Sequence, residues 1–236
     1  MRLLHILTHL IIGLIILLSP AEILAQRQEK VDTNTSSDSC SSFKLKETAG
    51  PLALLAYGSS KPIVSGIGRI DQDIRNQISA RYSSISYRAD DWLQWAPSTS
   101  VYALDAAGVR LKHRFREHLL LDAGSIIITG GAGFVMRKVS EQIKGFDIVD
   151  TQFPSGHTAN AFRGAEMLRQ EMSGRHPLLQ WSGYLVAGLV AGSRLMRGEH
   201  YLSEVVAGAG LGILSTSITY GLFHRIKKSK KGMPHR

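Results

Sequence analysis

The chain has 236 residues, of which 44% are hydrophobic and 20% are charged, with one cysteine and a formal net charge of +9. This length suits one domain or two. A mean hydropathy of -0.02 is too low for a chain made mostly of membrane spans, which argues against a polytopic channel. The single cysteine, Cys40, excludes an intramolecular disulfide framework and any multi-cysteine metal site.

The first 25 residues have the pattern of a secretory signal peptide. Arg2 precedes a long apolar run, and a small residue, Ala25, stands before Gln26. We therefore expect an exported protein of the periplasm or cell envelope; without cleavage, residues 1–25 would be an N-terminal membrane anchor. Residues 26–50 are polar and contain Cys40, and we expect them to be a flexible lead-in.

The hydrophobic pattern of residues 51–223 is helical. Ile70, Ile74 and Ile78 recur at a spacing of four on an otherwise polar segment. Signals for strands and hairpins are scarce. We therefore predict an all-α protein, a compact helical bundle with close packing through small residues. Further helices are expected from residue 90 and over residues 116–138, 155–172, 183–195 and 200–223.

Two apolar segments raise the question of membrane contact. Residues 119–136 are almost long enough to span a bilayer, but Asp122 interrupts them and a Gly-Gly-Ala-Gly run weakens them. Residues 183–195 are too short to span. We predict that both are buried core helices, with a membrane-embedded protein as the alternative.

Positive charge is concentrated at the C-terminus, where residues 224–236 hold six of the nine net charges and no acidic residue. Such a tail is most often solvated, but it also suits binding to an anionic membrane surface. No basic run is interleaved with aromatic residues, so we expect no nucleic-acid partner.

Residues 153–158 (Phe-Pro-Ser-Gly-His-Thr) stand directly before an amphipathic helix. Ser155 is a helix-opening residue, and the free N–H groups and dipole of a helix start favour binding an anion. Gly156 lets the backbone approach a ligand closely, with the imidazole of His157 beside it. Taken alone, the segment also fits an ordinary N-cap with an incidental histidine.

A second cluster lies between Arg194 and Glu204. Arg194 offers a planar fork of donors that suits phosphate oxygens. His200 and Glu204 are four residues apart, so on a helix Glu204 can accept the Nδ1 proton of His200 and leave a lone pair on Nε2. A salt-bridged surface helix is the alternative. A third, cationic stretch at residues 137–145 reads by itself as a solvated helix end.

Together these clusters resemble the type 2 phosphatidic acid phosphatase family, whose fold is shared with bacterial nonspecific acid phosphatases and vanadium haloperoxidases. The family pattern is Lys-x6-Arg-Pro, then Pro-Ser-Gly-His, then Ser-Arg-x5-His-x3-Asp. Residues 154–157 match the second motif in full, and residues 193–204 match the third with Glu for the last Asp. Residues 90–97 look like a further segment of the secreted branch of the family. The phosphatase-like domain would be residues 51–223, followed by the basic tail.

The resemblance implies a role for each matched residue. His200 would attack phosphorus and form a phosphohistidine, oriented by Glu204. His157 would protonate the leaving oxygen and then activate water. No metal or other cofactor is implied. The groups expected to hold the phosphoryl oxygens are Arg194, Arg137, Lys144, Ser155 and the Gly156 N–H.

The first motif departs from the family pattern, because Arg137 and Lys144 exchange its two cations and Gly145 replaces its proline. Lysine cannot reproduce the arginine fork, but the total positive charge is kept. We therefore expect a phosphomonoesterase that acts on a lipid phosphate or a small phosphate ester. A noncatalytic or weakly active phosphate-binding envelope protein is the alternative, and a vanadate-dependent peroxidase is a poor third.

Overall fold

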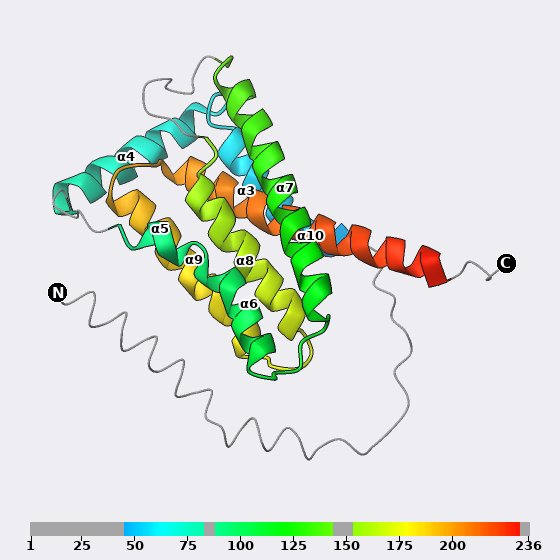
Figure 1. Ribbon diagram of the computed structural model, residues 1–236. Helices are drawn as coiled ribbons and strands as arrows, with labels where there is room; N and C mark the ends of the chain where they lie inside the picture. The colour runs from blue at the N-terminus through cyan, green and yellow to red at the C-terminus, as the bar shows by residue number, and fades with distance from the viewer. Residues whose placement is uncertain (1–44, 83–87, 144–152, 232–236) are drawn as a thin grey trace. The chain divides into compact units, whose positions relative to one another are not determined.

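The computed structural model describes residues 45–82, 88–143 and 153–231 (Figure 1). No strand occurs in these ranges, which confirms the predicted all-α class. The predicted signal peptide and Cys40 lie outside the described residues. The helices are α3 (Leu45–Ser59), α4 (Ser65–Tyr82), α5 (Asp90–Leu93), α6 (Ala96–Ala106), α7 (Phe115–Ser140), α8 (Gly156–Met172), α9 (Leu179–Met196) and α10 (Leu202–Lys231).

Both ends of the described helical region extend beyond the segments expected from composition. α3 begins at Leu45, within the expected polar lead-in, and its Thr48 is buried. The polar composition of residues 45–50 did not indicate a helix, because a helix that buries one face can be polar on the others. α10 continues to Lys231, so residues 224–231 prolong a helix. In this part of α10 the Lys227 Nζ lies 2.6 Å from Glu117 Oε1 of α7.

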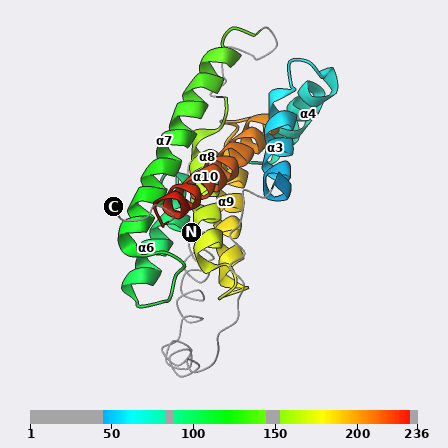
Figure 2. The ribbon, with the colours of Figure 1, turned by 90° about the vertical axis from the view of Figure 1, so that its right-hand side faces the viewer.

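α8 lies between α7 and α9 in both views of the ribbon (Figures 1 and 2). Its fully buried Ala161 and Ala165 pack with Ala187 and Val190 of α9. α10 approaches α8 through glycine: a Cβ on Gly208 would lie 2.6 Å from the Ser155 carbonyl oxygen. The predicted close packing through small residues is therefore present, and it holds the first turns of α10 against the start of α8.

The prediction that residues 119–136 form a buried core helix is wrong. The most apolar 18-residue window of α7 has a mean hydropathy of 1.7, yet only 17% of it is buried. Leu121, Ser125 and Thr129 face the bundle, a stripe that is mostly small and polar. The large apolar side chains point away from it: Leu119, Leu120, Ile126, Ile127, Phe134, Val135 and Val139 are all exposed.

α9 has two apolar faces, of which the bundle covers one. Gly183, Ala187 and Val190 are buried, so the prediction of a buried core helix over residues 183–195 is correct for this face alone. The opposite face exposes Trp181, Leu185 and Leu189. Apolar composition alone does not distinguish a helix with one exposed apolar face from a fully buried helix. By length and composition α7 and α10 are each able to cross a membrane, although 61% of the apolar window of α10 is buried in the bundle.

Candidate active site

The turn that contains Ser155, Gly156 and His157 is attached to the start of α10. The Ser155 N–H donates to the Glu204 carbonyl oxygen at 3.1 Å, and Ser155 Oγ lies 3.0 Å from Thr158 Oγ1. Ser155 and Thr158 are completely buried, whereas Gly156 is exposed at the first position of α8. The second and third motifs, separated by about forty residues in the chain, are thereby joined by a direct hydrogen bond.

His200 and Glu204 form a buried pair at the start of α10. His200 Nδ1 lies 2.8 Å from Glu204 Oε2, the contact that the spacing of four predicted. The Tyr201 N–H also donates to this oxygen, at 3.3 Å. Because a carboxylate only accepts, the proton of the neutral imidazole is held on Nδ1. The lone pair of His200 is then on Nε2, the arrangement that a nucleophilic histidine requires.

Arg194, in the last turn of α9, is buried and bound by carboxylates. Its Nη1 donates to Asp90 Oδ2 at 2.8 Å, and its Nη2 is paired with Glu199. Arg197 donates through Nη1 to the other Asp90 oxygen at 2.5 Å and is also paired with Glu199. The candidate phosphate-binding fork is therefore already engaged by acidic side chains in this structure.

His157 is connected to the same acidic segment. Its Nε2 lies 3.0 Å from Asp91 Oδ1, and both side chains are partly exposed. α5 therefore places Asp90 on Arg194 and the adjacent Asp91 on His157. Sequence reasoning missed these contacts, because each one joins residues that are far apart in the chain.

The charges around α5 shift the pKa values of two of these groups. Burial, together with the positive charge of Arg194, lowers the pKa of His157 below its ordinary value, although Asp91 acts in the opposite direction. Burial tends to raise the pKa of Asp90, but the hydrogen bond from Arg194 and the charge of Arg197 outweigh it, and the pKa lies below its ordinary value. Near neutral pH Asp90 is therefore charged and His157 is mostly neutral.

Asp90, Asp91 and His157 also bring possible metal-ligand atoms within 4.8 Å of one another. Both oxygens of Asp90 already accept hydrogen bonds from Arg194 and Arg197. A guanidinium beside the group repels a cation, so its chemistry fits an ion-pair network better than a metal centre.

The residues of the first motif are only partly described. Arg137 is in the last turn of α7, half exposed, with its Nε 3.7 Å from Glu141 Oε1. It shares a pocket with Phe153 and Gly156, so the structure brings it to the turn that holds the second motif. Lys144 lies outside the described residues.

A sequence profile of the PAP2 superfamily matches residues 109–228, which is half of the chain and contains all three motifs. The chain therefore belongs to the PAP2 superfamily, as the resemblance indicated, and the phosphatase class expected from the motifs agrees with this membership. Asp90 and Asp91 lie outside the matched residues.

Among curated proteins the chain is similar to the lipid A 1-phosphatase of Porphyromonas gingivalis, with 26% identity over 164 residues. The aligned region covers 69% of this chain but 37% of that protein, so the chain spans little more than a third of its relative's length. Among solved structures it is similar to a transmembrane PAP2-type phosphatidylglycerolphosphate phosphatase from Bacillus subtilis, with 17% identity and a TM-score of 0.45 over 79% of this chain and 99% of that one.

Proposed function

We propose that this protein is a phosphomonoesterase that works through a phosphohistidine intermediate without a metal ion. The observation that carries the proposal is the buried His200–Glu204 pair, with 2.8 Å between Nδ1 and Oε2. The pair holds the imidazole proton on Nδ1 and leaves the lone pair of Nε2 for attack, and His200 stands at the histidine of the third motif. Family membership supports the same reaction class.

In the first step His200 Nε2 attacks phosphorus, a P–N bond forms and the bond from phosphorus to the leaving oxygen breaks. The protonated form of His157, which is the minor form near neutral pH because its pKa is lowered, gives its proton to that oxygen. In the second step neutral His157 takes a proton from water, the resulting hydroxide attacks phosphorus, and the P–N bond breaks to release phosphate. Arg194 exchanges its carboxylate partners for phosphoryl oxygens and stabilises the charge of each transition state.

The exposed Gly156 N–H at the start of α8 would donate to the phosphoryl group, while the Ser155 N–H holds this turn on Glu204. Arg137 is close enough to this turn to share a pocket with Gly156, and Lys144 is proposed to complete the first motif. Glu in place of the usual Asp at position 204 does not prevent the hydrogen bond to His200, since the contact is 2.8 Å.

We propose a lipid phosphate as the substrate. The exposed apolar faces of α7 and α9 would be costly in water, and they suit a protein embedded in a bilayer. The relatives named above are phosphatases of lipid A and of phosphatidylglycerolphosphate. Residues 1–25 would direct export to the cell envelope, and the basic residues 224–236 would contact anionic headgroups.

Acid-labile label transfer tests the mechanism. The full chain, purified in detergent, is mixed with a ³²P-labelled phosphate ester and quenched within one turnover, with and without a chelator. Wild type should retain acid-labile, base-stable label in both conditions, and His200→Ala should retain none. Equal phosphatase activity in His200→Ala would overturn the mechanism. Binding of phosphate without turnover would identify instead a noncatalytic phosphate-binding protein.

A further inference from the structure

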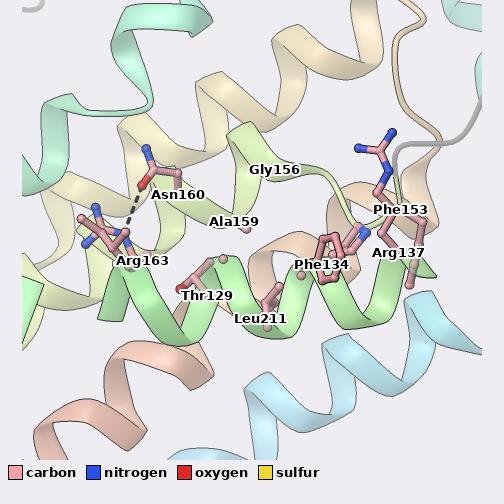
Figure 3. Close-up of a pocket in the computed structure, with 13 residues that line it drawn as sticks. Thr129, Phe134, Arg137, Phe153, Gly156, Ala159, Asn160, Arg163 and Leu211 are labelled. Carbon is pink, nitrogen blue, oxygen red and sulfur yellow. Dashed lines mark hydrogen bonds between the residues drawn. The ribbon is translucent and has the colours of Figure 1, made fainter. Parts of the chain in front are cut away.

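A pocket of about 400 Å³ runs between α7 and α8 beside the candidate active site (Figure 3). One end is formed by Arg137, Phe153 and Gly156, and the other by Thr129, Asn160 and Arg163. Phe134 and Leu211 lie between the two ends. The volume is within the range of small-molecule binding sites, and the pocket is apolar along its middle and polar at both ends.

Two glycines of α7 make the wall of this pocket. A Cβ placed on Gly130 would meet no atom within 4 Å, and one on Gly133 would make only an ordinary contact, 3.6 Å from Leu211 Cδ2. Packing therefore does not require glycine at either position, unlike Gly208. Because these two glycines line the pocket and carry no side chain, they leave its space open, although glycine weakens a helix interior.

The far end of the pocket holds buried polar atoms with unused hydrogen-bonding capacity. Arg163 is fully buried: its Nη1 is paired with Asp122 and lies 3.0 Å from Ser125 Oγ, and its Nε donates to Asn160 Oδ1 at 3.1 Å. Arg163 Nη2 and Thr129 Oγ1 have no hydrogen-bond partner among the described residues. Such orphaned groups are costly.

The charge at this end selects the kind of atom that would satisfy these groups. Asp122 already neutralises the guanidinium of Arg163, so a second anion would be unpaired. A neutral oxygen, from a hydroxyl or an ester carbonyl, accepts a hydrogen bond without adding charge. Thr129 and Arg137 are eight residues apart on α7, which places this oxygen about 12 Å along the helix from the cationic end.

We infer that this pocket binds one acyl chain of the substrate. This acyl chain carries a neutral oxygen, which Arg163 and Thr129 recognise. The phosphate would lie at the Gly156 end, the methylenes along Gly130 and Gly133, and the oxygen at the far end. This inference rests on the proposed lipid phosphatase function and adds to it the chemical nature of the substrate's acyl chain.

Binding of phosphonates, which no phosphatase hydrolyses, tests the pocket independently of catalysis. The probes are methylphosphonate, decylphosphonate and 10-hydroxydecylphosphonate, titrated into the full chain in lipid nanodiscs with empty nanodiscs as the blank. Gly130→Leu fills the pocket. Gly131→Leu is the matched control, because Gly131 is exposed, does not line the pocket and has no atom within 4 Å of its Cβ position.

We expect Gly130→Leu to weaken decylphosphonate binding at least tenfold and to leave methylphosphonate binding unchanged, while Gly131→Leu matches wild type with all probes. The hydroxyl should tighten binding to wild type about fivefold, the contribution of one hydrogen bond. Thr129→Val should remove that gain. Equal binding of decylphosphonate by Gly130→Leu and Gly131→Leu would overturn the acyl-chain site. Equal binding of decylphosphonate and 10-hydroxydecylphosphonate by wild type would overturn the recognition of the oxygen. Discrimination between probes without turnover of any phosphate ester would uphold the pocket and reject the phosphatase.

Discussion

Replacing Glu204 by glutamine changes one functional group in a buried contact. In the wild type Glu204 Oε2 accepts the Nδ1 proton of His200 at 2.8 Å and the Tyr201 N–H at 3.3 Å. Glutamine removes the negative charge that stabilises the positive imidazole formed when His200 is phosphorylated. Where its NH₂ group turns toward Nδ1, it gives up the Tyr201 contact, moves the imidazole proton to Nε2 and removes the lone pair from the attacking nitrogen. A wrong tautomer of this kind costs a serine protease about 10⁴ in kcat. We therefore expect Glu204→Gln to lower kcat about 10³- to 10⁴-fold.

The assay is the release of phosphate from a soluble aryl phosphate by the full chain in detergent, with KM measured for each variant. KM should stay within threefold of the wild-type value, because Glu204 does not contact substrate in this mechanism. Glu204→Asp is the matched control: it keeps an accepting carboxylate and should lose no more than about tenfold in kcat. Because Glu204 is buried, thermal unfolding must show that both variants are folded. A folded Glu204→Gln enzyme with kcat within tenfold of wild type would refute the tautomer argument.

Three further predictions concern α5 and α7. Asp91 raises the pKa of His157, so Asp91→Asn should lower that pKa and move the alkaline limb of the pH–kcat/KM profile to lower pH. An alkaline limb at the wild-type pH would contradict this role of Asp91. Asp90→Ala should cost about 3 kcal/mol in denaturant unfolding because it removes one of the two carboxylates that Arg194 and Arg197 share, while the more exposed Asp91→Asn should cost much less. The Asp90 contribution is present above the ordinary pKa of an aspartate and is lost as pH falls through the depressed folded-state value, so equal losses at pH 7 and pH 3 would be inconsistent with it. Finally, a membrane fraction washed with 1 M salt should retain the protein. Release of the protein into the aqueous phase would exclude the proposal that α7 embeds it in the membrane.

The motifs were predictable from sequence because their chemistry depends on short spacings. A spacing of four residues from His200 to Glu204 is enough to place the two side chains together, and the structure shows the contact. The absence of alternating patterns was likewise enough to predict an all-α fold. Local periodicity does not depend on what surrounds the chain, so it survives in the folded protein.

The surroundings of the site and of α7 were not predictable in the same way. The Asp90–Arg194 pair joins residues about a hundred positions apart, and neither side chain carries a local signal of its partner. For α7, an apolar segment can be buried by protein or by lipid, and composition is the same in both cases. Only the positions of Ser125 and Thr129 on the inner face show that the apolar side chains point outward.

The carboxylates on Arg194 also affect the last step of the proposed reaction. A phosphate ion that is bound only by free cations leaves slowly, since departure exposes buried positive charge. Here Asp90 and Glu199 can return to the guanidinium as phosphate departs, so the charge is never left uncompensated. In the proposed reaction the same exchange would weaken inhibition by inorganic phosphate. Asp90 and Glu199 would therefore compete with product phosphate for Arg194, which weakens the binding of product and speeds turnover.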